Sequence, residues 1–265
     1  MKFQKLGQHF LINKSAIKKI VLALDLKPGD TIIEIGPGRG ALTFPLLEEC
    51  KKIGCKLIAI EKDHGLAENL ELGIRNYGNP EIIIGDALKK LPAIIHNSSF
   101  IIQNYKIVGN IPYYITGKLL RILSELEKKP ESAVLMIQKE VAERIVARPP
   151  RMNLLAAAVQ FWAEPKILFT LKPDDFIPPP EVNSAVIKLT PKPTAYDLLP
   201  TTYYKLLHII FKQPRKTLIN NLSAEGGIKL PKNEIENALK TLKIDPKSRP
   251  QNLSLEDIQA IDNIL

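Results

Sequence analysis

The sequence predicts an α/β protein in which a mostly parallel, doubly wound sheet is followed by a small helical domain. Two observations carry this prediction. Short apolar runs rich in β-branched residues alternate with helix-length segments over the first two-thirds of the chain. Beyond Pro191, Pro193 and Pro200, only helical patterns remain. A chain of 265 residues, 45% of them hydrophobic, is long enough to bury such a core without disulfides or metals.

Five apolar runs have the character of strands buried on both faces. They are Thr31–Ile35, Lys56–Glu61, Glu81–Asp86, Tyr105–Asn110 and Ala133–Gln138. The start of the chain predicts a loop and then an amphipathic helix, and further helical patterns lie at Leu42–Lys52, Leu66–Leu72, Thr116–Lys128 and Leu154–Trp162. Two later runs, Lys166–Leu171 and Ser184–Leu189, could add strands to the same sheet.

The C-terminal part contains helical patterns alone. They cover Tyr203–Lys212, Lys216–Leu222, Asn233–Leu242 and Leu255–Leu265. Ser254 and Asp257 form the sequence signature of a capping box in front of the last of these helices. We therefore expect two domains, residues 1–194 with the sheet and residues 195–265 with the helices.

The charge balance favours a polyanionic partner. Lys and Arg total 37 against 28 Asp and Glu, which gives a net charge of +9 and a sequence pI near 9.4. No run of about 18 apolar residues is present, so no membrane span is expected. Lysines interrupt the first apolar stretch, which excludes a signal peptide and favours the cytoplasm.

The two cysteines, Cys50 and Cys55, do not form a C-x-x-C pair. The four histidines are scattered and offer no zinc-binding spacing. We therefore expect no metal site, and a reducing compartment is the simplest setting.

A glycine cluster follows the first predicted strand, at Gly36, Gly38 and Gly40. Glycines at alternate positions let the backbone turn sharply and approach a ligand, as in nucleotide pockets at the carboxyl edge of α/β sheets. Glu61 and Asp86 end the next two strands, where acids can bind ribose hydroxyls and an adenine amino group. NAD enzymes and S-adenosylmethionine enzymes share this pattern, so it leaves the cofactor open.

The segment Asn110-Ile111-Pro112-Tyr113 follows the fourth strand, where catalytic residues collect on such sheets. A nucleobase amine is a poor nucleophile because its lone pair is conjugated into the ring. The Asn110 side-chain oxygen and the Ile111 carbonyl could accept its hydrogens and draw the nitrogen toward tetrahedral geometry. Pro112 would fix the backbone and Tyr113 would stack on the base. Alignment and electrostatics would then supply most of the catalysis.

Seven ordered blocks resemble one family, the ribosomal small-subunit RNA adenine dimethyltransferases. The blocks are Leu6–Leu11, Glu34–Gly40, Asn110–Tyr113, Gln138–Val141, Phe176–Val186, Phe211–Thr217 and Ile244–Ser254. The resemblance implies a Rossmann-like class I S-adenosylmethionine-dependent methyltransferase domain and a helical RNA-binding domain. It implies dimethylation of N6 on two adjacent adenosines in a hairpin loop near the 3′ end of 16S rRNA, with a role in small-subunit maturation.

The resemblance also assigns roles by position. Gln8, His9 and Leu11 would fold over the donor. Gly36 and Gly38 would line the methionine and ribose portion of the donor. Glu61 would hold the ribose hydroxyls, and Asp86 would hold the adenine amine. Asn110 and Ile111, the residues before Pro112, would orient the target N6. Asn110 would also border the donor. Tyr113 and Phe176 would flank the target base. The sequence departs from the family at His9 and Tyr114, where Asn is usual. We expect donor binding to be kept.

Basic residues should follow the RNA phosphates, and the candidates are Arg144, Arg148, Lys212, Arg215, Lys216 and the N-terminal Lys2 and Lys5. The expected partner is the small ribosomal subunit, and monomer is the default state. Three alternatives remain: a large-subunit rRNA methyltransferase, a ribosome-assembly factor with little catalysis, and an NAD-dependent oxidoreductase. The last leaves Asn110–Tyr113 without a purpose, and the C-terminal blocks favour small-subunit RNA.

Overall fold

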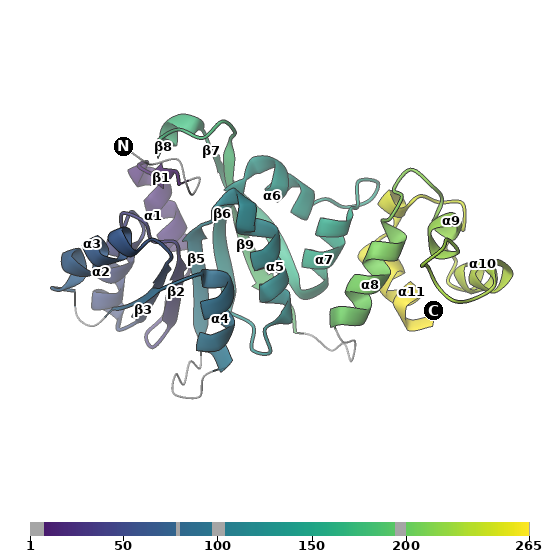
Figure 1. Ribbon diagram of the computed structural model, residues 1–265, viewed down its shortest axis with the longest axis horizontal. Coiled ribbons are helices and arrows are strands. Elements are labelled where there is room, and N and C mark those ends of the chain that lie inside the picture. Colours follow the sequence, from purple (N-terminus) through teal and green to yellow (C-terminus); the bar gives the residue numbers. More distant parts are fainter. Residues whose placement is uncertain (1–7, 78–79, 97–103, 194–199, 265) are drawn as a thin grey trace. The chain divides into compact units, whose positions relative to one another are not determined.

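The computed structural model describes residues 8–77, 80–96, 104–193 and 200–264 (Figure 1). The chain forms two compact units. The first contains Met1–Ala142 and Pro165–Pro191, and the second contains Glu143–Glu164 and Lys192–Leu265. These units differ from the expected domains, residues 1–194 and 195–265, because Glu143–Glu164 groups with the C-terminal helices.

A seven-stranded sheet forms the centre of the first unit, in the order β4-β3-β2-β5-β6-β9-β7. The strands are β2 (Thr31–Ile35), β3 (Lys56–Glu61), β4 (Glu81–Ile84), β5 (Tyr105–Asn110), β6 (Ser132–Gln138), β7 (Ala163–Leu171) and β9 (Ser184–Pro191). Strands β2 to β6 pair in parallel, and β9 pairs antiparallel with β6. The doubly wound α/β fold is therefore confirmed, together with both of the later strands.

Helices cover both faces of this sheet. Figure 1 shows α4 (Ala87–His96) and α5 (Thr116–Glu125) on the face toward the viewer, and α1 (Lys14–Ala23) and α2 (Thr43–Ile53) behind it. Helix α3 (His64–Ile74) follows β3, and α6 (Lys139–Ile145) follows β6. The helical patterns predicted α2, α3 and α5 to within a few residues at each end, but α4 and α6 were not predicted.

The position of β4 at the edge of the sheet corrects one expectation. We expected all five runs to be buried on both faces, yet Glu81 is exposed and Ile82, Ile83 and Ile84 are only half-buried. An edge strand has one neighbour and less cover from the helices, so an apolar composition alone does not bury it.

The second unit is helical. It contains α7 (Leu154–Trp162), α8 (Pro200–Ile210), α9 (Leu218–Leu222), α10 (Lys232–Thr241) and α11 (Leu255–Ile264). Helix α7 belongs to this unit because the Phe161 ring stacks on Tyr203 of α8, with centroids 4.1 Å apart. The predicted capping box is confirmed: the Ser254 amide donates to Asp257 and the Asp257 amide donates to Ser254 Oγ.

Two short strands, β1 (Phe10–Leu11) and β8 (Phe176–Ile177), form a separate antiparallel pair. The sequence predicted a loop where β1 lies and no strand where β8 lies. Residues Gln8–Leu11, called the strap below, are held by this pairing and by hydrogen bonds of the Ile12 amide and the Asn13 side chain to Asp175. The strap is thereby fixed to a segment more than 160 residues later in the chain.

Cys50 and Cys55 form a disulfide, with Cα atoms 4.5 Å apart. Gly54 adopts a left-handed conformation with φ +78° at the end of α2, and this turn brings the two residues together. The spacing between the cysteines did not predict this bond, which departs from the expectation of a reducing setting. No helix in the described part of the chain is long and apolar enough to cross a membrane.

Candidate active site

The candidate site is a cleft at the carboxyl edge of β2, β3, β4 and β5. Two adjoining hollows form it and share Gln8, Gly36, Glu61 and Pro112. The hollow toward the strap is bordered in addition by His9, Phe10, Leu11, Glu34, Pro37, Gly38, Ala41, Leu42, Asn110, Ile111 and Tyr113. The hollow toward β4 is bordered in addition by Ile35, Ile60, Lys62, Gly85, Asp86, Ala87, Tyr114 and Ile115.

The glycine loop after β2 forms the floor of this cleft. Gly36 and Gly38 have φ values of +66° and +56°, a backbone conformation that favours glycine. A Cβ on Gly38 would lie 2.9 Å from the Phe10 ring of the strap, so only glycine leaves room for the strap. The guanidinium of Arg39 stacks over the same Phe10 ring, 4.5 Å from its centroid. The glycine loop and the strap therefore pack against each other beside the cleft.

Glu61 lies at the end of β3 and its side chain is buried. Its Oε2 accepts a hydrogen bond from the Gly38 amide, and its Oε1 accepts from the amides of Lys62 and Asp63. A carboxylate offers about four acceptor positions, so one remains for a ligand hydroxyl. Glu61 thus holds the glycine loop in place and keeps one acceptor position open.

Asp86 follows β4 and borders the second hollow. Its Oδ1 accepts from the Leu88 amide, and its Oδ2 lies 3.2 Å from Lys62 Nζ. Burial acts to raise the pKa of Asp86, but the Leu88 hydrogen bond and the Lys62 and Lys89 charges outweigh it and lower the pKa. Asp86 therefore carries a negative charge, and the exposed Lys62 side chain covers one of its oxygens.

Glu34 is a member of the site that sequence reasoning did not select. It lies on β2, is 1% exposed and borders the hollow toward the strap. Its Oε2 accepts a hydrogen bond from the hydroxyl of Thr43, the first residue of α2. Burial, opposed by this hydrogen bond and reinforced by the charge of Glu61, raises the pKa of Glu34 to about 8. Its position two residues before Gly36 was the only signal available in the sequence.

The Asn110 side chain is fixed by the strap. Its Nδ2 donates a 2.6 Å hydrogen bond to the His9 carbonyl oxygen. Because the amide nitrogen is used in this way, the side-chain oxygen is the atom left to accept a hydrogen bond in the cleft. The Ile111 amide donates to the Met136 carbonyl of β6, which fixes the next peptide.

The Tyr113 ring lies at the mouth of the same hollow. Its hydroxyl is 3.0 Å from Ser184 Oγ, and its ring is near-parallel to the His9 ring, with centroids 6.1 Å apart. Nδ1 of His9 donates to the Pro178 carbonyl at 2.8 Å, because a carbonyl can only accept. Tyr114 is 60% exposed and borders the second hollow. His9 therefore links the strap, the Asn110–Tyr113 turn and the proline segment after β8.

Most residues selected from the sequence come together here. Gln8, His9, Leu11, Gly36, Gly38, Glu61, Asp86 and Asn110–Tyr113 all border the cleft. Phe176 does not: its side chain is 2% exposed and packs in the apolar core, in register with Leu11. In this structure Phe176 pairs with the strap, and its ring is too deeply buried to stack on a base.

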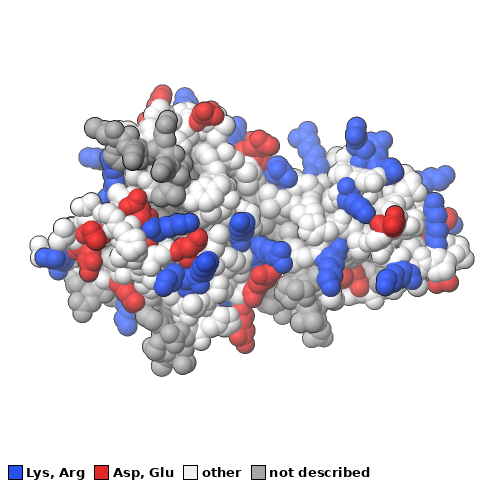
Figure 2. Space-filling view, in the orientation of Figure 1, with Lys and Arg blue, Asp and Glu red and all other residues white. Residues whose placement is uncertain are grey.

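The candidate RNA-binding residues Arg144, Arg148, Lys212, Arg215 and Lys216 are exposed and belong to the second unit. Figure 2 shows numerous Lys and Arg side chains on one face of the molecule. The loop that carries three of them is organised by Asn221, which is 2% exposed. Its side chain accepts from the Gln213 amide and donates to the Gln213 and Thr217 carbonyls. Lys2 and Lys5 lie outside the described residues.

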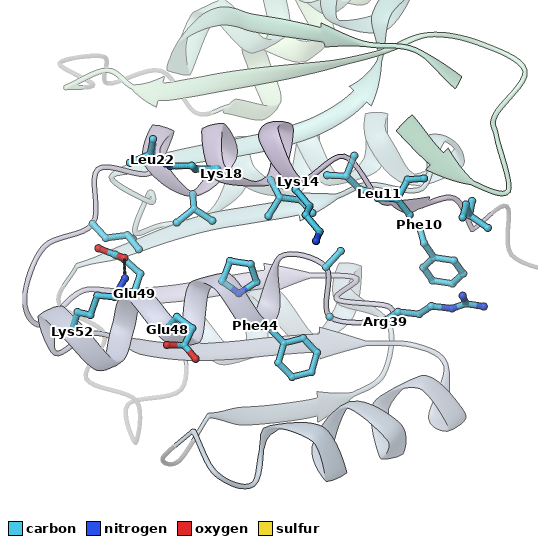
Figure 3. Close-up of a pocket in the computed structure, with 18 of the residues that line it drawn as sticks. Phe10, Leu11, Lys14, Lys18, Leu22, Arg39, Phe44, Glu48, Glu49 and Lys52 are labelled. Carbon is cyan, nitrogen blue, oxygen red and sulfur yellow. Dashed lines mark hydrogen bonds and ion pairs between the residues drawn. The ribbon is translucent and has the colours of Figure 1, made fainter. Parts of the chain in front are cut away.

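A larger groove of about 890 Å³ lies beside the cleft, between α1 and α2 (Figure 3). Lys14 and Lys18 project from its α1 wall, and Glu48 and Glu49 lie on its α2 wall. Arg39 and Lys52 also line the groove, as does Asp25, and the remaining lining is apolar. The groove therefore carries charges of both signs.

Comparisons with known proteins agree over the whole chain. The sequence model of the family described as Ribosomal RNA adenine dimethylase matches residues 2–265. A Ribosomal RNA small subunit methyltransferase A of Dehalococcoides mccartyi is 41% identical, over 95% of this chain and 84% of that protein. The protein of the same name from Bacillus cereus is 35% identical, over 99% of this chain and 90% of that protein.

Two solved structures share the architecture. A dimethyladenosine transferase from Plasmodium falciparum has a TM-score of 0.82 and 27% identity, over 96% of both chains. The 23S rRNA methyltransferase ErmE has a TM-score of 0.73 and 22% identity, over 96% of this chain and 98% of that one. At that identity, the second likeness concerns the fold alone.

Proposed function

Because the chain belongs to the ribosomal RNA adenine dimethylase family, we propose that it transfers methyl groups from S-adenosylmethionine to N6 of adenosine in small-subunit rRNA. The targets we propose are two adjacent adenosines in a hairpin loop near the 3′ end of that RNA. The observation that carries the proposal is the Asn110 side chain, which borders the cleft and whose amide nitrogen is held by the His9 carbonyl, so that its oxygen remains as an acceptor.

The cleft fits this donor. S-adenosylmethionine supplies an electrophilic methyl group on a positively charged sulfur. The glycine loop leaves space for a ligand against the backbone, and Glu61 has an acceptor position for a ribose hydroxyl. Asp86 supplies an acceptor in the second hollow for an adenine amine, once the Lys62 side chain moves aside.

The chain's part in the reaction is to hold the target amine in line with the donor. The Asn110 oxygen and the Ile111 carbonyl would accept the two N6 hydrogens, which draws the nitrogen lone pair out of conjugation. Tyr113 would stack on the adenine and is itself fixed by Ser184. Orientation and electrostatic stabilisation are therefore the principal catalytic devices, and no general base is required.

The test of this function is a methyl-transfer assay with labelled S-adenosylmethionine. The substrates are small subunits that lack the adenosine methylation and, separately, deproteinised large-subunit RNA. We expect N6-dimethyladenosine in the small-subunit RNA alone. Product in the large-subunit RNA would reassign the substrate, and absence of product from both despite donor binding would favour an assembly factor.

Replacing Glu61 by Ala is expected to weaken donor binding about tenfold or more, because it removes a charged acceptor and leaves three backbone amides without a partner. Titration calorimetry with S-adenosylmethionine measures this effect. Glu68→Ala is the matched control, because that residue is exposed on α3. Unchanged donor affinity in Glu61→Ala would remove Glu61 from the donor site.

The second unit would bind RNA through Lys212, Arg215 and Lys216. Replacing all three by Gln should weaken subunit binding and make it less dependent on salt. The slope of the logarithm of the binding constant against the logarithm of the salt concentration should become smaller by roughly 2, for three lost phosphate contacts. Donor affinity should stay the same, because none of these residues borders either hollow of the cleft. Binding measured between low and moderate salt tests this.

The control variant for this experiment changes three exposed lysines elsewhere in the same unit: Lys229, Lys243 and Lys247. An equal loss of binding in both variants would show that net charge matters rather than this loop.

We further propose that the enzyme acts as a monomer in the cytoplasm, where its ribosomal substrate is assembled. Sedimentation of the purified protein tests the monomer.

A further inference from the structure

Two carboxyl groups, those of Glu34 and Glu61, border the hollow toward the strap, and their surroundings differ. Glu61 accepts three backbone hydrogen bonds, a set of partners that suits a carboxylate. Glu34 is as deeply buried, but within the described part of the chain its side chain has one hydrogen-bond partner, the Thr43 hydroxyl at 2.8 Å. The mechanism proposed above gives Glu34 no task, although it borders the same hollow as Asn110.

No described lysine or arginine forms an ion pair with Glu34. The nearby basic residues are engaged elsewhere: Lys62 contacts Asp86, and the Arg39 guanidinium lies over the Phe10 ring. The other groups around Glu34 are the negative Glu61 on β3, the Thr43 hydroxyl on α2 and, across the hollow, His9 of the strap. A buried carboxyl without a cation, beside a second carboxylate, is stable as the neutral acid.

We propose that Glu34 is a neutral carboxylic acid in the empty cleft and releases its proton to solvent when a cationic donor binds, so that the cleft favours the donor over its product. This inference rests on the proposed function. S-adenosylmethionine carries a net charge of about +1 near neutral pH, and S-adenosylhomocysteine, which has lost the sulfonium charge, carries none. An anionic Glu34 would attract the former and gain nothing from the latter.

The proton balance follows from this difference. Donor binding converts the Glu34 acid to its carboxylate and one proton leaves the cleft. After methyl transfer the sulfur is neutral, so the carboxylate again lies beside Glu61 without a compensating charge and takes a proton back. This step lowers the affinity for the product and assists its exchange for a new donor molecule.

The raised pKa of Glu34 sets the pH range of the effect. With a pKa of about 8 in the free protein, about nine in ten Glu34 side chains are protonated at pH 7. A bound cation lowers that pKa. Donor binding therefore releases protons at pH values between the pKa of the donor-bound protein and that of the free protein, and donor affinity increases with pH up to about 8. We expect an increase of about tenfold between pH 6.5 and 8, and much less for the product.

Titration calorimetry tests the release directly. Donor is titrated into the full-length protein at pH 7 in phosphate and in Tris, whose heats of ionisation differ. We expect about one proton released per donor bound and far fewer per product bound. A binding heat that is the same in both buffers would overturn the inference while leaving the proposed function intact. Failure of the donor to bind at all would overturn both.

The variant Glu34→Gln keeps the shape of the neutral acid and cannot ionise. It should lose the proton release and the pH dependence, and at pH 8 it should bind donor about tenfold more weakly while product affinity changes less than about twofold. His9→Asn is the control, because histidine is the other residue type in the hollow that can change charge near neutral pH. Proton release lost in His9→Asn but kept in Glu34→Gln would reassign the proton to His9.

An infrared difference spectrum gives a readout independent of binding heats. Donor binding should remove the carbonyl band of a protonated carboxylic acid in the wild-type protein, and this change should be absent from Glu34→Gln. The same band loss in both proteins would contradict the assignment to Glu34. This measurement also serves if Glu34→Gln binds donor too weakly for calorimetry.

Discussion

Replacing Asn110 by Ala is expected to lower the rate of methyl transfer about 10²–10³-fold, the cost of removing one preorganised polar group from a catalytic site. The side chain is held in place by its 2.6 Å hydrogen bond to the His9 carbonyl, so its oxygen is oriented before any substrate arrives. Loss of that acceptor leaves the N6 lone pair conjugated with the ring. The measurement is a single-turnover rate on unmethylated small subunits.

Donor affinity should change less than the rate in this variant, because Glu61, Asp86 and the glycine loop remain in place. Asn104→Ala is the matched control, since Asn104 is exposed just before β5 begins. A second variant, Asn110→Asp, keeps an oxygen but places it against the His9 carbonyl, and two acceptors repel each other. We therefore expect it to be slow as well. A near-normal rate in Asn110→Ala would show that the Ile111 carbonyl and Tyr113 suffice to orient the amine.

Replacing Lys106 by Met is expected to lower the free energy of unfolding by about 3–5 kcal/mol, the usual cost of breaking a buried ion pair on one side. Lys106 lies in β5 with 4% of its side chain exposed. Its Nζ is 2.7 Å from Asp30 Oδ2, 2.6 Å from the Asp25 carbonyl oxygen and 3.5 Å from Glu131 Oε2. Removing the ammonium leaves the buried Asp30 carboxylate without its cation. Urea denaturation at pH 7 measures the difference.

The double variant Lys106→Met, Asp30→Asn should recover much of this loss, because it leaves no uncompensated charge. Lys118→Met, at an exposed position of α5, should change stability little. Lys106 lies at the start of β5 and Asn110 at its end, so folded Lys106→Met should bind donor normally. A loss of stability in Lys106→Met no larger than that in Lys118→Met would contradict the ion-pair argument.

Local patterns predicted the parts of the fold that depend on local physics. The apolar run at Tyr105–Asn110 matches β5, and the run at Lys56–Glu61 matches β3. Once those strands are placed in parallel, their carboxyl ends meet at one edge of the sheet. The sequence alone therefore groups Glu61, Asp86 and Asn110 into one site.

The errors lie where contacts are distant in the sequence. The sequence around Phe176 is the same whether its ring faces a base or the core. Packing against the strap places the ring in the core. The pairing of β1 with β8 joins two-residue segments too short to carry a strand pattern. Helix α7 was predicted correctly, but its membership of the second unit depends on the stacking of Phe161 on Tyr203.

Hydrophobic patterns and motifs were sufficient to predict the alternation of strands and helices, the glycine loop, and the family to which the chain belongs. Only tertiary packing determines which groups meet: the His9 carbonyl orients the Asn110 side chain, and the Asp30 carboxylate pairs with Lys106. Packing also places Glu34 next to the Thr43 hydroxyl and, among the described residues, in no ion pair with a lysine or arginine. The physical reason is that hydrophobic periodicity reports only which face of an element is buried. Hydrogen bonds and charges depend on which atoms meet after distant segments have packed.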